Sequence, residues 1–548
     1  MSASDLRRLE RLKATYGEGV ATAKLGVLRR LSRSRLRTAG QVERLHEALC
    51  FLRAYPDDAR VLAQVTRMLE RFDRRPDLLA HRDRLADTGI AGTAIHYRFY
   101  WSTALWLARR WPDQLSLERD DAEAAGRIAR ALPLVAPAVA SEWLGSAALP
   151  PFAAIDRLRG RRRDAAWLVE RLARMPGDGF TRESFADAID APYVLEPGRD
   201  TPSRSRAFFP PAPRAFQATG LRRARPELRA AMSVPPRGVR QLSRRDGAAL
   251  IELARGSMIT RARDLAAFEH GDPRDVRMVD DGDGLAFAFC GVRPERRFLL
   301  PAVYGCLMLK NGVPIGYVQV DALGPYAAVS FNTFETFRGG EAAYVFGRLL
   351  SSIRHLFGAE SFSIEPYQLG RGNEEGIETG AWWFYQKLGF RPQSIAARRI
   401  MRVELARTRI NPRHRSSART LGKLAESHLF FDLDAEARRG LPPLGSAYER
   451  AVAWLARRGG GEDALAAAER SALAVTGLGS LAHFSRDERL AWRRWAPLIA
   501  SLPGVSRWRP AQRRELAEIV RAKAGRQELP YLVRFAAHPR LAKALFGG

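Results

Sequence analysis

Residues 331–392 read FNTFETFRGGEAAYVFGRLLSSIRHLFGAESFSIEPYQLGRGNEEGIETGAWWFYQKLGFRP, and this stretch decides the fold. Alternating polarity over residues 327–334 predicts a strand, which leads into a basic, glycine-bearing turn at residues 338–340. Apolar residues then recur at helical spacing over residues 342–357, and residues 361–365 alternate again. Strand, glycine turn, helix and strand thus follow one another as in a βαβ unit.

The turn before this helix predicts an anion site. The first amides of a helix have no intrahelical partner and carry the positive end of the helix dipole. Gly339 and Gly340 would let a phosphate or pyrophosphate come close to those amides. A turn with only a structural role is the alternative, because glycine is common in tight turns of every kind.

Two motifs in this stretch resemble the GNAT superfamily of acyl-CoA-dependent N-acyltransferases. Residues 337–343 read FRGGEAA, similar to the Arg/Gln-x-x-Gly-x-Gly/Ala turn that binds the coenzyme A pyrophosphate in that family. Residues 385–390 read YQKLGF and match the family's Tyr-x-x-x-Gly-Phe segment without a gap. Glu341 stands where the family usually has its middle glycine, and its carboxylate could occupy the helix dipole and repel a pyrophosphate.

Two predicted hairpins precede these motifs. Residues 303–309 and 315–320 flank Asn311-Gly312, which favours a tight turn of the kind that family members commonly have before the coenzyme turn. Residues 276–279 and 285–292 flank a turn rich in Asp and Gly, which we interpret as a hairpin in preference to a metal loop. Residues 395–403 are predicted to add a further strand, and the resemblance covers about residues 247–407.

The resemblance implies acetyl-CoA or another acyl-CoA as co-substrate, an amine as acceptor, and no metal. It implies Tyr385 as the acid that protonates the departing thiolate, while a packed aromatic side chain is the alternative. Glu335, just beyond a strand, and Glu365, on the next strand, are the carboxylates placed to act as a base, or else are surface groups. The candidate coenzyme contacts, one by charge and the others by main-chain amides, are Arg338, Gly339, Gly340, Ala342 and Ala343.

A chain of 548 residues predicts about three domains. Helical spacing interrupted by Pro, Gly or Asp predicts an all-α domain over residues 1–195, and the Pro-, Ser- and Arg-rich residues 196–239 predict an extended linker. Residues 240–407 would hold the GNAT-like domain and residues 408–548 a C-terminal helical domain. The predicted fold class is therefore α+β, with a central GNAT-like mixed sheet and its helices flanked by all-α N-terminal and C-terminal domains.

The net charge of +29 raises nucleic acid as a partner. Arginine supplies nearly all of the basic residues, so a bias toward GC-rich codons explains the charge equally well. Clusters at residues 29–37 and 157–163 are the candidate surfaces for a nucleic-acid or protein partner, or are solvated faces. Aromatic and basic residues alternate over residues 97–111, which fits either stacking on single-stranded nucleic acid or a buried helix.

Several classes of protein lose support. Cys50, Cys290 and Cys306 are far apart in apolar surroundings, which predicts core residues in a reducing compartment. The N-terminus lacks an apolar signal segment, and prolines interrupt the most apolar stretch, residues 132–155, so we expect a cytoplasmic protein without a membrane span. Dispersed histidines and the lack of a Gly-x-Ser-x-Gly motif disfavour metalloenzymes and hydrolases.

Two functions are consistent with these features. The favoured one is an N-acyltransferase in which a neutral amine attacks the thioester directly. The alternative keeps the fold and loses the chemistry, as a catalytically inactive GNAT-like scaffold whose basic helical domains bind nucleic acid or a protein. Binding of acetyl-CoA distinguishes the two, because a ligand that binds the folded state raises its stability.

Overall fold

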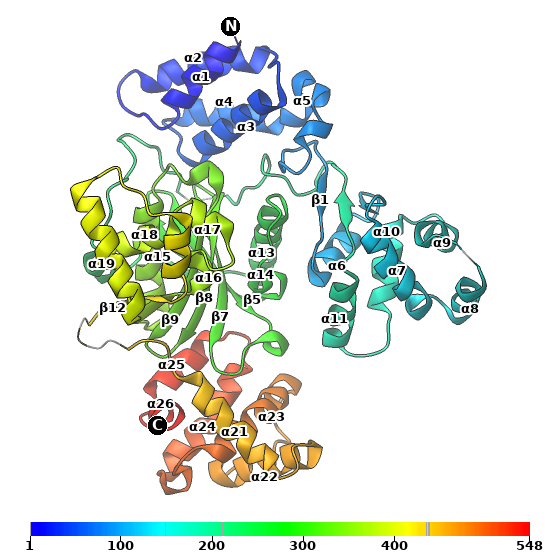
Figure 1. Cartoon of the computed structure of the whole chain (residues 1–548), viewed down its shortest axis with the longest axis vertical. Helices are drawn as coiled ribbons and strands as arrows, with labels where there is room; N and C mark the ends of the chain where they lie inside the picture. Colours follow the sequence, from blue (N-terminus) through cyan, green and yellow to red (C-terminus); the bar gives the residue numbers. More distant parts are fainter. Residues whose placement is uncertain (1, 148, 211–212, 435, 437–438, 548) are drawn as a thin grey trace. The chain divides into compact units, whose positions relative to one another are not determined.

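The computed structural model describes residues 2–147, 149–210, 213–434, 436 and 439–547, and it is mixed α and β (Figure 1). The chain forms two compact units, each assembled from separate segments. The first, here called the N-terminal unit, runs to Leu221 and adds Ala249–His270 and Lys310–Pro314. The second, here called the sheet unit, contains Arg222–Ala248, Gly271–Leu309 and the chain from Ile315 onward. This division by packing cuts across the predicted segments.

The N-terminal unit begins with a helical layer whose ends are capped as the sequence requires. Thr38 and Asp58 precede α3 and α4, and their side chains accept hydrogen bonds from the main-chain N–H groups of Gln41 and Val61. The helices of this layer are α1 Ser2–Leu12, α2 Val20–Arg33, α3 Ala39–Ala54, α4 Ala59–Glu70 and α5 Pro76–Ala80.

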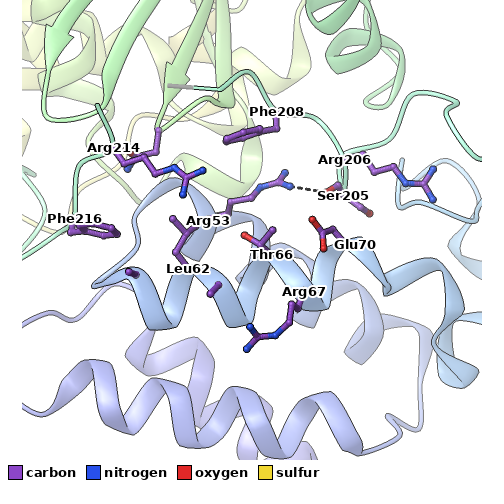
Figure 2. A pocket seen from close by; sticks show the side chains of 13 residues that line it. Arg53, Leu62, Thr66, Arg67, Glu70, Ser205, Arg206, Phe208, Arg214 and Phe216 are labelled. Atoms are coloured by element: carbon purple, nitrogen blue, oxygen red, sulfur yellow. Dashed lines mark hydrogen bonds between the residues drawn. The ribbon is translucent and has the colours of Figure 1, made fainter. Parts of the chain in front are cut away.

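The segment after residue 196 packs against this layer, although its composition predicts an extended linker. The Arg53 guanidinium on α3 donates hydrogen bonds to the main-chain oxygens of Arg204, Ser205 and Ala207. Figure 2 shows the bond to Ser205. Ser203 and Ser205 are buried. Side-chain hydrogen bonds thus hold a chain segment that has no regular structure of its own.

The all-α prediction for residues 1–195 is wrong. The strands β1 Ile95–Tyr97, β2 Leu115–Leu117 and β3 Tyr193–Leu195 form an antiparallel sheet with β3 in the middle. Each strand has three residues, too few for alternating polarity to stand out. The helices around them are α6 Trp101–Arg110, α7 Ala122–Val135, α8 Ala138–Ser146, α9 Pro151–Leu158, α10 Asp164–Ala173 and α11 Gly179–Ile189, and later in this unit α14 Ala266–Glu269.

The aromatic run at residues 97–111 belongs mainly to the core of the N-terminal unit. Phe99, Trp101 and Trp111 are buried in one apolar cluster, and Trp106 packs against it with its ring edge-on to Trp111. Burial favours the core interpretation of this run over stacking on nucleic acid. All three cysteines are buried as well, as predicted.

A nine-stranded sheet organises the sheet unit, in the order β11-β12-β10-β9-β8-β7-β6-β5-β4. β9 and β10 pair in parallel, as the βαβ prediction requires, while β8–β9, β5–β6 and β10–β12 are antiparallel. Both predicted hairpin turns are present, with positive φ at Asp283 and Asn311. The strands are β4 Gly238–Gln241, β5 Gly271–Gly282, β6 Leu285–Val292, β7 Ala302–Lys310, β8 Val313–Leu323, β9 Tyr326–Thr333, β10 Ser361–Ile364, β11 Arg391–Pro392 and β12 Leu429–Asp432.

The helix α15, Ala342–Phe357, connects β9 to β10 and confirms the predicted apolar stripe. Val345, Phe346, Leu349 and Ile353 are buried. The helix α12, Leu228–Ser233, packs against α15 at Gly347, where an added Cβ would lie 3.5 Å from Ala231 of α12 and 3.0 Å from Pro226, which precedes α12. Short helices follow on the way to β11, namely α16 Pro366–Leu369, α17 Glu374–Glu378 and α18 Ala381–Lys387.

The predicted strand at residues 395–403 is wrong, because this segment is the helix α19, Ile395–Ile410. Ala397, Met401 and Glu404 are its buried positions, which is helical spacing, and Ser394 caps its N-terminus. The sheet is completed instead by β12, which lies in the region predicted to be all-α. The helix α20, Ala418–Leu424, precedes β12 in the chain.

The C-terminal helices include an αα-hairpin across Gly459, Gly460 and Gly461. None of the helices in the described part of the chain is long and apolar enough to cross a membrane. The C-terminal helices are α21 Leu444–Ala456, α22 Glu462–Thr476, α23 Arg486–Ser501, α24 Pro510–Lys523, α25 Leu529–Ala537 and α26 Leu541–Phe546. One further helix, α13 Arg244–Ile259, lies much earlier in the chain, before β5.

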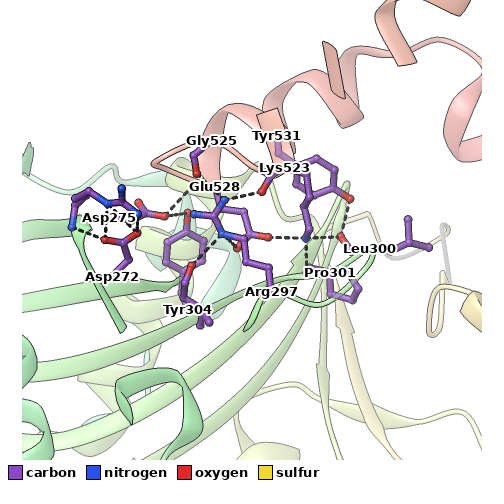
Figure 3. Close-up of polar contacts among 12 residues, drawn as sticks. Asp272, Asp275, Arg297, Leu300, Pro301, Tyr304, Lys523, Gly525, Glu528 and Tyr531 are labelled. Carbon is purple, nitrogen blue, oxygen red and sulfur yellow. Dashed lines mark hydrogen bonds and ion pairs between the residues drawn. The ribbon is translucent and has the colours of Figure 1, made fainter. Parts of the chain in front are cut away.

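A buried ionic network joins the α24–α25 turn to the sheet (Figure 3). Lys523 Nζ lies 2.5 Å from Glu528 Oε1 and also donates to the main-chain oxygen of Pro301 at 2.9 Å. The main-chain N–H of Glu528 donates to Asp275 on β5 at 2.9 Å. Arg297 donates to two main-chain oxygens of the same turn. The turn is thus held by charged groups that are almost fully removed from water.

Candidate functional site

The strands β9 and β10 separate partway along their length. Their pairing covers Tyr326, Ala327 and Ala328 of β9, whereas β8 stays paired with β9 as far as Thr333. β10 ends at Ile364, and Pro366, which has no N–H to donate to a ladder, begins α16. The second half of β9 therefore has no partner on β10 among the described residues.

A cavity of about 260 Å³ lies where the two strands separate. Phe331, Asn332 and Thr333 of β9 form one side, and Ala342 at the first turn of α15 forms another. Arg338 and Glu375 lie at its edge, with further walls from α17 and α18. The predicted anion turn, the βαβ crossover and the strand opening thus meet at one cavity.

The first turn of α15 carries no side-chain cap among the described residues. Glu341, the residue at the cap position, is only 3% exposed, and its carboxylate accepts a hydrogen bond from the main-chain N–H of Arg222 at 3.0 Å. A Cβ added at Gly339 would meet no atom within 4 Å. The Glu341 carboxylate therefore holds a neighbouring segment and does not cap the helix, while the approach at Gly339 is open.

Arg338 is partly exposed and forms an ion pair with Glu375, near the start of α17. Both residues line the cavity. A phosphate can replace a partly exposed carboxylate as the partner of an arginine, because both present oxygen pairs that match the guanidinium fork. Arg338 is thus the predicted coenzyme contact that the structure brings to the cavity, together with the backbone at Ala342.

Tyr385 lies on α18 and is 3% exposed, among the rings of Phe346, Phe384 and Phe390. Its hydroxyl makes a long contact of 3.5 Å to the main-chain oxygen of Phe331. Burial raises the pKa of Tyr385 above its usual value, so the phenol is protonated at neutral pH. Its ring does not line the cavity, although the β9 residue that it contacts does.

The two predicted bases differ in position. Glu335 is exposed in a 3₁₀ turn after β9 and does not line the cavity. Glu365 directly follows β10, and its carboxylate accepts a hydrogen bond from the Ser330 hydroxyl at 3.2 Å. The structure thus connects Glu365, and not Glu335, to the half of β9 that has no partner on β10.

A row of polar side chains that was not identified from the sequence lies on the sheet face that carries Ser330 and its partner Glu365. Gln319 of β8 is directly opposite Ser330 of β9, and Asp321 accepts a hydrogen bond from Gln319 Nε2 at 3.1 Å. Burial, reinforced by the nearby Glu365 charge, raises the pKa of Asp321 to about 6. The signal was visible as polar residues at every second position of apolar strands, at 319 and 321 and again at 330 and 332.

Among the described residues, no group of His, Cys, Asp or Glu side chains is arranged to hold a metal ion. Comparison of the chain with family models, curated proteins and solved structures finds no match.

Proposed function

We propose that the sheet unit is an acyltransferase that moves an acetyl or other acyl group from acyl-CoA to an amine. The observation that carries this proposal is the cavity between β9 and β10, which combines an uncapped helix N-terminus, an arginine that lines it and a strand whose second half has no partner on β10. An acyl-CoA needs these features together, since it has a pyrophosphate, a polar arm with amide groups and a thioester.

The residues at the turn fit the phosphate end of such a ligand. The amides at the start of α15 and the open approach at Gly339 favour a negative group, and Arg338 can exchange Glu375 for phosphate. On the side of β9 that points away from β8, the N–H and C=O groups of residues 329–333 are free of β10 and can bind the amides of the pantetheine arm as a short strand. The resemblance of residues 337–343 to the GNAT coenzyme turn supports the same assignment.

Two groups would carry the proton transfers. As the amine attacks the carbonyl carbon, a C–N bond forms and the C–S bond breaks. Asp321 lies opposite Ala328 and does not line the cavity, so it would accept the proton that the amine loses through an intervening water. A carboxylate with a pKa of about 6 is ionised at neutral pH yet more basic than an ordinary aspartate. Tyr385 donates a proton to the departing thiolate, and exchange with solvent restores both groups. Glu365, whose carboxylate accepts a hydrogen bond from Ser330, is the second candidate base.

A non-catalytic scaffold is the second candidate function. The burial of Tyr385 among aromatic rings favours it, since a proton donor must reach the leaving group. In this case the cavity would bind no acyl-CoA, and nucleic acid or a protein would be the partner of the basic helical regions.

Calorimetric titration with acetyl-CoA tests the proposal. We expect saturable binding to the full chain, and a rise in stability of about 2.7 kcal/mol at 100 times the dissociation constant. Arg338→Glu should abolish this binding, whereas Arg402→Glu, an equal charge change on an exposed face of α19, should leave it unchanged. No binding of acetyl-CoA to the unaltered chain would favour the scaffold.

A further inference from the structure

A larger cavity lies within the N-terminal unit and plays no part in the proposed acyl transfer. Its volume is about 660 Å³, which is within the range of sites for small ligands. One side is a face of α4, and the other comes from the chain around Arg206 and around Phe216 (Figure 2).

The wall of this cavity is apolar and partly aromatic. α4 contributes Ala59, Leu62 and Ala63, which have the i, i+3, i+4 spacing of one helix face, and Phe208 and Phe216 come from the other side. Phe216 is 46% exposed, a large apolar surface for a side chain beside a cavity. An apolar or aromatic group in the cavity would remove this surface from water.

Positive charge surrounds the apolar wall. Arg53, Arg67, Arg206 and Arg214 line the cavity, against one carboxylate, that of Glu70. Arg206 forms an ion pair of 2.7 Å with Asp73, and Arg67 donates to the side-chain oxygen of Gln64. Arg214 is exposed and forms no ion pair with any described residue. The cavity therefore has an excess of positive charge that its own side chains do not neutralise.

Arg53 is the fixed part of this charge. It is only 7% exposed, and its guanidinium donates hydrogen bonds to three main-chain oxygens at 2.7 to 3.2 Å. Its Nε atom is buried and has no hydrogen-bond partner among the described residues. A buried guanidinium that is held by neutral oxygens keeps its full charge next to the cavity, where low polarity strengthens its attraction for an anion.

We propose that this cavity binds a small anion that carries a flat ring, with a nucleoside phosphate as the ligand class. The Arg53 guanidinium lies 6.0 Å from the centre of the Phe208 ring, so charge and aromatic surface are adjacent. The ring would stack against Phe208 and Phe216, and the phosphate would lie between Arg53 and Arg214, which Figure 2 shows on the same side of the cavity as Phe216. This inference does not depend on acyl transfer.

Titration of the full chain with AMP, followed by calorimetry, tests this proposal. We expect AMP to bind at least about tenfold more tightly than either adenosine or inorganic phosphate, because each half uses only part of the cavity. Arg214→Glu should weaken AMP binding by about tenfold or more, and Phe216→Ala should weaken it severalfold. Both side chains are exposed, so the fold should tolerate these changes.

Two control variants make the result specific. Arg33→Glu places the same charge change on an exposed position of α2 outside the cavity and should leave AMP affinity unchanged. Arg338→Glu, in the sheet unit, should also leave it unchanged and excludes binding at the acyl-CoA cavity. The proposal is overturned if AMP does not bind, if Arg33→Glu weakens binding as much as Arg214→Glu, or if phosphate binds as tightly as AMP.

Discussion

The carboxylate of Glu341 and the main-chain N–H of Arg222 form a hydrogen bond of 3.0 Å, so the acid in front of α15 is committed to a neighbouring chain segment. We expect Glu341→Gly to lower the free energy of unfolding by about 1–3 kcal/mol, because the partly buried hydrogen bond from the Arg222 N–H to the carboxylate is lost. Acetyl-CoA affinity should not rise. Urea unfolding and calorimetry measure the two effects. Tighter binding with unchanged stability would show instead that the carboxylate repels phosphate.

The ion pair of Arg338 and Glu375 predicts opposite effects of two neutral substitutions. Glu375→Gln should tighten acetyl-CoA binding severalfold, because Arg338 no longer has to leave a carboxylate. Arg338→Gln should weaken binding about tenfold, the loss of one charge-assisted contact. Equal affinities for the two variants would remove Arg338 from the site.

Asp321→Asn tests the base through the pH dependence of the reaction. In the unaltered protein, kcat/KM should rise as the pH passes through about 6, because only the ionised carboxylate accepts the amine proton. The substitution should lower kcat by about 100-fold or more and remove that rise. Gln319→Ala, which leaves the carboxylate in place, should shift the apparent pKa upward, since the hydrogen bond from Gln319 favours the charged form.

The same carboxylate predicts a change in stability with pH. The pKa of Asp321 is raised in the folded protein, so folding takes up a proton between the ordinary aspartate value and about 6. Its contribution to stability is therefore fully present below about 4 and is lost as the pH rises through about 6. Urea midpoints of Asp321→Asn should fall less over this interval than those of the unaltered protein.

Tyr385→Phe separates an acid from a packed ring. The hydroxyl makes only a contact of 3.5 Å, so we expect stability to change by less than about 1 kcal/mol. If the phenol protonates the thiolate, kcat should fall by about 100-fold while acetyl-CoA binding stays constant. Unchanged kcat, together with unchanged binding, would assign Tyr385 to the core alone.

The buried pair of Lys523 and Glu528 predicts a strongly non-additive effect on stability (Figure 3). Glu528→Gln should cost about 3–5 kcal/mol, because it leaves a buried ammonium without its counter-charge. Replacing both residues with Met and Leu should cost much less than the single change. Chemical unfolding of the three variants measures this difference, and additive losses would contradict the coupling.

The parts of the fold that the sequence predicts are those fixed by nearby residues. The stripe of α15 and the hairpin turn at Asn311 are short-range patterns, and both are present. The segment at 395–403 was misassigned because nine residues with Ile, Met and Val match both a strand and a helix, and only the buried spacing of Ala397 and Met401 decides. β12 was missed because its partner, β10, is distant in the sequence.

The candidate site was predictable only in part, for the same reason. Arg338 stands in a recognisable turn, and the structure places it at the cavity. Asp321, Ser330 and Glu365 come from three strands, and their proximity depends on a register that a single sequence does not give. Nothing in the composition of residues 196–239 indicates that the N–H of Arg222 engages Glu341.

The tip of the β7–β8 hairpin, Lys310–Pro314, is counted with the N-terminal unit, while both strands continue in the sheet unit. The polypeptide changes unit five times, after Leu221, Ala248, His270, Leu309 and Pro314. Consequently no single proteolytic cut and no truncation at either end releases one unit intact. Fragments of the protein that end at any one of these positions should therefore be unstable, because each would lack part of one unit. Evolutionary loss of one unit would likewise require new connections between the remaining segments of the other.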